Sequence, residues 1–208
     1  AEMELLANLS HANIIRFERM VLDFPKMCSV IEYAKSGSLR ETLVASPFLD
    51  WRNEKRNLAD SIADGMHYLH SLYPPVLHRD LKTMNVLVTE WQGIKISDFG
   101  DARLNTRWSG DDNAVKNPSQ PSSSDQNAAT DFVGTSLFMA PEVMRSERFT
   151  KACDVYSFGC VLVDLVVGGK LKDLYFQSFG SEYTEAKFHQ AISSGWRPEL
   201  PPYFCKKF

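Results

Sequence analysis

The sequence predicts an α+β fold on three observations. Two short runs, 17–22 and 27–33, flank a turn sequence that contains Pro25, as expected for a pair of strands. Two longer segments, 51–72 and 151–167, carry apolar residues in patterns typical of helices. Hydrophobic residues make up 44% of the 208-residue chain, which is enough for a sizeable core.

The elements near the N-terminus are predicted from local preferences. Residues 2–9 are rich in strong helix formers, so we expect a helix there that ends at the turn sequence 10–15. The strands 17–22 and 27–33 follow. We expect the next helix to begin at the Gly-Ser-Leu sequence that ends at Leu39.

The segment 51–72 is predicted to be an amphipathic helix. Asp50 is placed to cap its first turn, and Pro74 with Pro75 stops it. Its apolar residues fall on one stripe at helical spacing, as expected for residues that face the core: Leu58, Ile62, Met66 and Leu69. Two short strands, 86–88 and 94–96, are expected farther along.

The C-terminal part is predicted to be helical. Segment 151–167 is apolar almost all round from Val155 onward, which is typical of a buried helix, and Gly168 with Gly169 terminates it. One more helix is expected, reaching about Ser194. Segment 109–131 is almost wholly polar and cannot bury enough surface to offset its ordering entropy, so we expect a mobile insertion there.

Two polar motifs carry chemistry. Residues 78–85 read His-Arg-Asp-Leu-Lys-Thr-Met-Asn, and residues 98–100 read Asp-Phe-Gly. Phosphoryl transfer from ATP has a loose, highly charged transition state. It needs one carboxylate to receive the acceptor hydroxyl's proton, and an amide and a second carboxylate to hold Mg²⁺. Asp80 fits the first role, Asn85 and Asp98 fit the second, and Lys82 can neutralise charge on the moving group.

Chance alone could place polar residues in a loop, but the order of the motifs argues against it. The Asp-Phe-Gly motif is followed by Met-Ala-Pro-Glu at 139–142. The sequence thereby resembles the catalytic domain of eukaryotic protein kinases, of the serine/threonine type. With Asp-Val-Tyr-Ser-Phe-Gly at 154–159, it is similar to the tyrosine-kinase-like group. The resemblance implies ATP and Mg²⁺ as cofactors and a protein substrate with a serine or threonine acceptor.

The resemblance also implies a truncated, bilobal kinase fold for 1–208. An N-lobe remnant with the regulatory helix and two strands would occupy 1–33, and a hinge 34–38. A mainly helical C-lobe would occupy 39–208, with the insertion at 109–131 inside its activation segment. The resemblance also implies that Asp154 would hold the backbone of the catalytic loop, residues 78–85.

Several residues acquire binding roles through the resemblance. Ile31 would be the gatekeeper, the backbone of Glu32 and Ala34 would bind the adenine edge, and Leu87 would form the apolar floor under adenine. An ordinary strand that runs into a turn is the alternative for the hinge. Glu2 would pair with the lysine of the third strand, or be a solvated helix glutamate.

Two further residue sets follow from the family pattern. Thr135 would bridge Asp80 and Lys82, and a lysine at position 82 argues against a tyrosine kinase. Phe99 is expected to turn inward so that the preceding carboxylate faces the metal. A packed column across the lobes is expected to contain four side chains: Leu6, Phe17, His78 and Phe99.

Arg79 suggests control by phosphorylation. A guanidinium beside the catalytic aspartate needs an anionic partner, and in similar kinases a phosphate on the activation segment supplies it. An upstream activating kinase would be the partner that adds this phosphate. Thr130 is the first choice because of its distance before Glu142, although these hydroxyls could also belong to a solvated linker: Ser119, Ser122, Ser123, Ser124 and Thr130.

Composition excludes other classes of protein. A net charge of −3 provides no basic surface for nucleic acid. The apolar run 161–167 contains Asp164 and is too short for a membrane segment. Four cysteines without metal-ligand spacing are typical of reduced thiols, so we expect a cytoplasmic protein or the intracellular part of a larger one.

Two functions remain open at this stage. No glycine-rich phosphate loop and no strand-three lysine precede Glu2, so we expect little activity from the isolated chain. A pseudokinase that serves as a scaffold or binding module is the alternative to an active kinase. The intact Asp80, Asn85 and Asp98 favour the enzyme, because a pseudokinase commonly lacks one of them.

Overall fold

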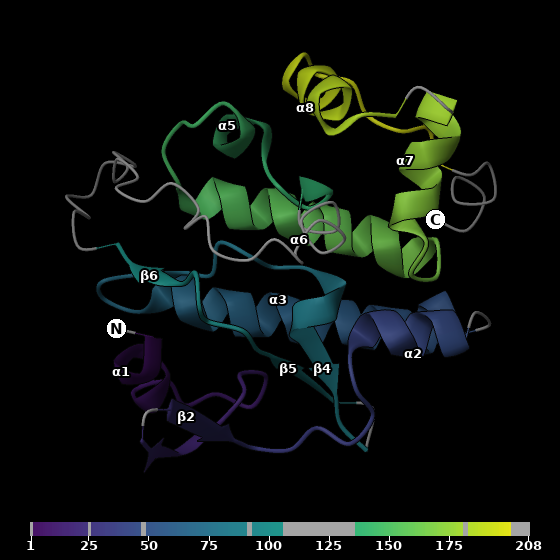
Figure 1. The fold of residues 1–208 in the computed structure, drawn as a ribbon. Coiled ribbons are helices and arrows are strands. Elements are labelled where there is room, and N and C mark those ends of the chain that lie inside the picture. The colour runs from purple at the N-terminus through teal and green to yellow at the C-terminus, as the bar shows by residue number, and fades with distance from the viewer. Residues whose placement is uncertain are drawn as a thin grey trace.

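The computed structural model describes residues 2–24, 26–46, 49–90, 93–105, 136–180 and 183–200, and only the backbone of 2–4, 26 and 27. Figure 1 shows α1 and the β1–β2 hairpin on one side of α3, and α5 to α8 on the other. The elements in chain order are α1 (Glu2–Ala7), β1 (Phe17–Asp23), β2 (Lys26–Ile31), α2 (Leu39–Ala45), a π-helical turn (Trp51–Lys55), α3 (Arg56–Ser71), β3 (Val76–Leu77), a 3₁₀ turn (Thr83–Asn85), β4 (Val86–Val88), β5 (Ile94–Ile96), β6 (Arg103–Leu104), α5 (Pro141–Met144), α6 (Lys151–Val166), α7 (Leu171–Phe179) and α8 (Glu185–Ser193).

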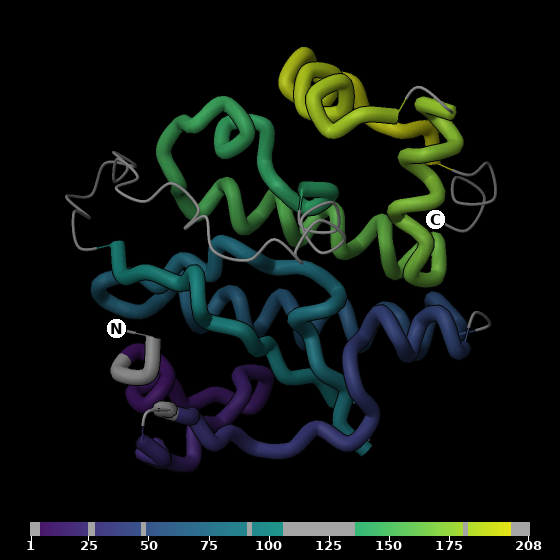
Figure 2. Tube along the Cα trace, in the orientation of Figure 1, coloured from purple at the N-terminus to yellow at the C-terminus, as the bar shows by residue number. Residues whose placement is uncertain are grey.

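The two predicted N-terminal strands are confirmed. β1 and β2 form an antiparallel hairpin whose register runs from the pair Phe17–Ile31 to the pair Asp23–Lys26. β2 ends two residues earlier than the sequence predicted. The chain then continues as a connection with a turn at residues 35–36, seen in the Cα trace, which joins the hairpin to α2 (Figure 2). Ser38 caps α2 and exchanges the two hydrogen bonds of a capping box with Glu41.

Helix α3 lies in the middle of the molecule (Figure 1). Asp50 accepts a hydrogen bond from Asn53 N, as predicted for a cap, and the first turn is wound as a π-helix. The predicted apolar stripe is confirmed, since every member of it is buried: Leu58, Ile62, Met66 and Leu69. Gly65 allows close packing, because a Cβ at this position would lie 2.7 Å from Ile96 Cδ1.

Two small antiparallel ladders bring distant segments together. β3 pairs with β6, and β4 pairs with β5. The His-Arg-Asp segment leaves β3 and enters β4, while the Asp-Phe-Gly segment leaves β5 and enters β6. Because each segment is held at both ends by the same two ladders, the two motifs lie next to each other.

Helix α6 forms the centre of the C-terminal part. It is capped by Thr150 and ends at Gly168 and Gly169, whose φ angles of 68° and 77° favour glycine. The prediction of burial all round from Val155 is wrong at that residue, which is 62% exposed. The helix nevertheless contributes these residues to the interior: Cys153, Asp154, Ser157, Cys160, Val161, Asp164 and Leu165.

The last two helices enclose an aromatic cluster. α8, predicted from sequence, is capped by Thr184, whereas α7 was not predicted. The rings of Tyr175 and Phe188 lie 5.0 Å apart, and those of Phe179 and Trp196 lie 4.9 Å apart. Within the described residues no single helix is long and apolar enough to span a membrane, although the bent pair α6 and α7 passes that test together.

Candidate active site

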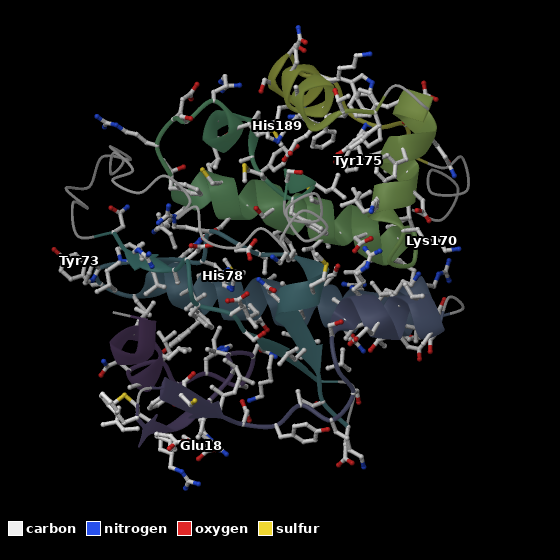
Figure 3. All side chains as sticks on the ribbon, viewed as in Figure 1. Glu18, Tyr73, His78, Lys170, Tyr175 and His189 are labelled. Atoms are coloured by element: carbon white, nitrogen blue, oxygen red, sulfur yellow. The ribbon has the colours of Figure 1, made fainter. Side chains whose placement is uncertain are left out.

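Ser97, which directly precedes the Asp-Phe-Gly motif, joins it to the segment 78–85 by hydrogen bonds. Ser97 donates to Asn85 O through both its N–H, at 2.8 Å, and its hydroxyl, at 2.9 Å. His78 is fully buried in the middle of the molecule, and its Nε2 lies 3.1 Å from Ser97 O (Figure 3). The residue before Asp98 is therefore fixed to the loop that carries Asp80 and Asn85.

Asp80 has one oxygen engaged and one available. Its Oδ2 accepts hydrogen bonds from Lys82 Nζ at 2.7 Å and from Asn85 Nδ2 at 2.9 Å. Among the residues that the structure describes, none donates to its Oδ1. Asp80 and Lys82 are both largely buried, with 13% and 14% of their side chains exposed. An acceptor hydroxyl could thus reach a carboxylate whose orientation is already fixed.

Asn85 and Asp98 offer oxygen atoms suited to Mg²⁺. Asn85 Nδ2 donates to both Asp80 O and Asp80 Oδ2 at 2.9 Å, which leaves its Oδ1 as an acceptor. Asp98 is exposed and has a φ of 63°, a conformation that aspartate tolerates better than most residues. Mg²⁺ prefers one or two protein oxygens together with phosphate and water, so this donor pair fits the ion.

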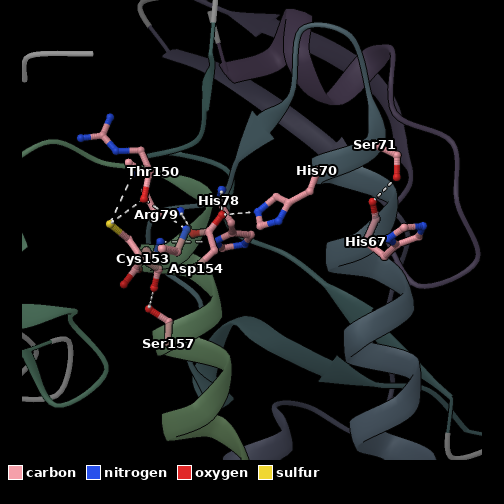
Figure 4. Close-up of polar contacts among 11 residues, drawn as sticks. His67, His70, Ser71, His78, Arg79, Thr150, Cys153, Asp154 and Ser157 are labelled. Carbon is pink, nitrogen blue, oxygen red and sulfur yellow. Dashed lines mark hydrogen bonds and ion pairs between the residues drawn. The ribbon is translucent and has the colours of Figure 1, made fainter. Parts of the chain in front are cut away.

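Asp154 holds the backbone at the start of the loop formed by residues 78–85 (Figure 4). Its Oδ2 accepts from His78 N at 3.0 Å, and its Oδ1 accepts from Arg79 N at 2.9 Å. Only 2% of the residue is exposed. Arg79 has a φ of 72°, an unfavourable conformation that these two bonds help to maintain.

His70 makes a contact that the sequence did not indicate. Its Nε2 lies 2.8 Å from Asp154 Oδ2, so α3 is connected to the same carboxylate that holds the loop. No periodic or motif signal in the sequence connects His70 with a residue so far along the chain.

The guanidinium of Arg79 lies in a crowded, half-buried environment. It stacks on the ring of Phe149 at 4.0 Å from the centroid. Burial and the nearby Arg103 lower its pKa, while Asp101 and Asp154 oppose that shift. An added anion near this position would be electrostatically favourable.

The residues predicted for adenine binding lie at the end of the hairpin and on β4. Ile31 is 39% exposed at the end of β2, and Leu87 is half-buried at the centre of β4. Glu32 N donates to Arg16 O at 2.9 Å, so only the carbonyl of Glu32 remains for a ligand. Its carboxylate pairs with Lys95 at 2.9 Å, which the sequence did not indicate.

Members of the predicted column lie in the core. Phe99 is fully buried, and its ring centroid is 5.1 Å from that of His78. Leu6 is buried, and Phe17 packs against the same core. Other predicted positions lie outside the described residues: the side chain of Glu2, and all of Thr135, Thr130 and Ser122.

Comparisons with known proteins place the chain among protein kinases. The model of the protein kinase domain family matches residues 1–197. The chain is 37% identical to mitogen-activated protein kinase kinase kinase 13-A of Xenopus laevis over 173 residues, covering 80% of this chain and 15% of that protein. It is 37% identical to serine/threonine-protein kinase CTR1 of Arabidopsis thaliana over 166 residues, covering 79% and 18%.

A third relative matches along the whole chain. The probable serine/threonine-protein kinase drkB of Dictyostelium discoideum is 36% identical over 209 residues, which covers 100% of this chain and 26% of that protein. The chain therefore spans about a quarter or less of the length of these curated relatives.

Proposed function

Because the chain belongs to the protein kinase domain family, we propose that it is the catalytic part of a serine/threonine protein kinase. The reaction is transfer of the γ-phosphate of ATP to a serine or threonine hydroxyl of a protein substrate. The relatives named above support this assignment, since two are called serine/threonine-protein kinases and the third is called a mitogen-activated protein kinase kinase kinase. In this proposal 1–33 belong to the N-lobe, 34–38 to the hinge and 39–208 to the C-lobe.

The observation that carries the proposal is the state of Asp80. Lys82 and Asn85 fix Oδ2, so Oδ1 can accept a hydrogen bond from the substrate hydroxyl and receive its proton as the new P–O bond forms. The bond between phosphorus and the β–γ bridging oxygen breaks, and ADP leaves with that oxygen. Lys82 Nζ is close enough to this carboxylate to neutralise charge on the phosphoryl group. Thr135 would complete the contact between these two residues.

The nucleotide would be held from both sides. Asn85 Oδ1 and the carboxylate of Asp98 would hold Mg²⁺, which neutralises charge on the phosphates when bound. Glu32 O and Ala34 N would bind the adenine edge, beside Ile31 and above Leu87.

Cys28, Cys153 and Cys160 are free thiols, which supports a cytoplasmic or other intracellular setting.

The test of the function is phosphoryl transfer by the full-length protein, with Asp98→Ala as the variant. We expect phosphoserine or phosphothreonine in the product and a Kd for Mg-ATP raised about 10- to 100-fold in the variant, since even indirect support of a metal ligand is worth that much. Nucleotide binding is measured by titration with a fluorescent ATP analogue. Asp64→Ala, an exposed change on α3, serves as the control. Unchanged Mg-ATP binding in Asp98→Ala would remove Asp98 from the metal site, and a full-length protein without transfer activity would favour a pseudokinase.

We also propose that a phosphate on the activation segment pairs with Arg79. The half-buried guanidinium has its pKa lowered by burial, so a nearby dianion would stabilise its charge. Thr130 is the first candidate and Ser122 the second. An upstream activating kinase would be the enzyme that phosphorylates them.

Arg79→Ala is expected to lower the activity of the full-length enzyme about tenfold or more. Alanine at all five hydroxyl positions of the segment should have the same effect, because each change removes at least one charge-assisted hydrogen bond. Phosphatase treatment should lower wild-type activity equally and leave both variants unchanged. Wild-type activity in both variants would rule out this form of control.

A further inference from the structure

A second buried carboxylate of α6 contacts the catalytic loop. Thr83 Oγ1 donates to Asp164 Oδ2 at 2.6 Å, and both residues are fully buried. The thioether of Met84 is the other acceptor near this hydroxyl, at 3.8 Å, and is much the weaker one. Since the hydroxyl has one proton, it is directed to Asp164.

Asp164 is also held from its own end of the helix. Its Oδ1 accepts from Leu171 N at 2.9 Å, and its backbone carbonyl accepts from Gly169 N at 2.9 Å. Gly169 lies against α2, where a Cβ would be 3.2 Å from Leu43 Cβ. The carboxylate is therefore fixed by the corner between α6 and α7, and its position does not depend on Thr83.

The energetics make this arrangement a costly way to stabilise a fold. Burial raises the pKa of Asp164, and the bonds from Thr83 and Leu171, together with the charge of Arg40, only oppose that shift. Apolar residues of similar size at such a site are often as stabilising as a buried charge or more so. A geometric role explains the buried hydrogen bond better than a contribution to stability.

The element that the bond fixes is the turn between Lys82 and Asn85. Thr83 begins the 3₁₀ turn Thr83–Asn85, and Asn85 N donates to Lys82 O at 2.9 Å across it. Asp154 already holds the start of the loop through His78 N and Arg79 N. Asp164, about 15 Å farther along the same helix, holds its end.

We propose that the Thr83–Asp164 hydrogen bond positions Asn85 and Lys82 for binding of the metal and of the phosphoryl group. Thr83 and Asp164 are positioning residues, because they act through Asn85 and Lys82 and touch neither ligand. The predicted effect on metal and phosphoryl binding rests on the proposed kinase function. The predicted effect on the geometry of the turn rests on the hydrogen bond alone. It makes α6 a support with two contacts, one at each end of the loop.

The test compares Thr83→Val, which keeps the shape and removes the hydroxyl, with Thr83→Ser, which keeps the hydroxyl. Thr89→Val is the matched control, because it removes a hydroxyl that bonds Gly93 O outside the loop. The first readout is hydrogen exchange of the metal-free, full-length protein over residues 82–86. The second is Mn²⁺ binding in the presence of ATP, followed by electron paramagnetic resonance.

In Thr83→Val we expect exchange over 82–86 to be about fivefold faster, the effect of losing one hydrogen bond, with exchange at 76–79 unchanged. The Kd for Mn²⁺ should rise about tenfold or more, and Thr83→Ser should restore both values. Asp164→Asn, which keeps the volume but loses one acceptor, should change both readouts in the same direction and carries the test if Thr83→Val does not fold.

The inference would be overturned if Thr83→Val showed the same hydrogen exchange and the same Mn²⁺ binding as the wild type. Where Thr83→Val does not fold, the same result in Asp164→Asn would overturn it. A different result would be that the wild-type protein transfers no phosphate while the variants still lose Mn²⁺ binding. That result would overturn the proposed function and leave the positioning role intact. The two failures are thus distinguishable within one set of variants.

Discussion

Replacing Asp80 with alanine is expected to lower the kcat of phosphoryl transfer about 1,000-fold while leaving the Kd for ATP within about threefold of the wild-type value. The reason is the separation of roles within the site. Asp80 Oδ1 is available to an acceptor hydroxyl, whereas the oxygens that would face the metal belong to Asn85 and Asp98. The measurement is steady-state transfer to a protein substrate, with nucleotide affinity determined separately by titration.

Asp80→Asn is the informative companion variant. Its amide keeps the size of the carboxylate and one acceptor oxygen, but it cannot receive a proton. We expect a loss of kcat close to that of the alanine variant if proton acceptance and orientation of the hydroxyl through Oδ1 are what matter. Ordinary turnover in Asp80→Ala would show that the assigned role is wrong, and a loss confined to Asp80→Ala would reduce that role to orientation of the hydroxyl.

The parts of the fold that the sequence predicted well are those set by neighbouring residues. Asp50 caps the helix that begins at 51, because its side chain can accept from an N–H group of the first turn. The stripe from Leu58 to Leu69 is buried as its helical spacing predicted. Gly168 and Gly169 end α6 for a local reason as well, since both have positive φ. These features need no knowledge of the rest of the molecule.

The parts that it missed depend on contacts between segments far apart. β6 contains only Arg103 and Leu104 and exists because β3 lies beside it. The bond from His70 to Asp154 joins α3 to α6, and nothing near His70 in the sequence signals it. Val155 looked buried because its helix is apolar, yet it lies on a face that the described elements do not cover.

The candidate site falls between these two cases. The motif spacing predicted roles for Asp80, Asn85 and Asp98, because the proposed chemistry requires those groups in that order. The spacing did not indicate that Asn85 Nδ2 and Lys82 Nζ would both donate to Oδ2 of Asp80. This shared contact is the reason why Oδ1 is the oxygen proposed to meet the substrate. Such side-chain geometry is a property of the folded loop and is not visible in the order of residues.

Asp154→Ala is expected to lower the free energy of unfolding by about 3 to 5 kcal/mol. The carboxylate is 2% exposed and accepts bonds from His78 N, Arg79 N and His70 Nε2. Alanine would leave two backbone N–H groups without this acceptor, a buried one at His78 and a half-buried one at Arg79. The measurement is denaturant unfolding, with Asp60→Ala as a surface control that should change stability by less than about 0.5 kcal/mol.

The same variant should lose activity at temperatures at which it is still folded. Arg79 has a φ of 72°, and without Asp154 its backbone can relax to a more favourable conformation. Asp80 is the next residue, so that relaxation would move the carboxylate away from Lys82 and Asn85. We therefore expect kcat to fall at least about 100-fold well below the unfolding midpoint. A variant that is destabilised but fully active while folded would show that Asp154 supports the fold alone, and that the loop keeps its geometry without it.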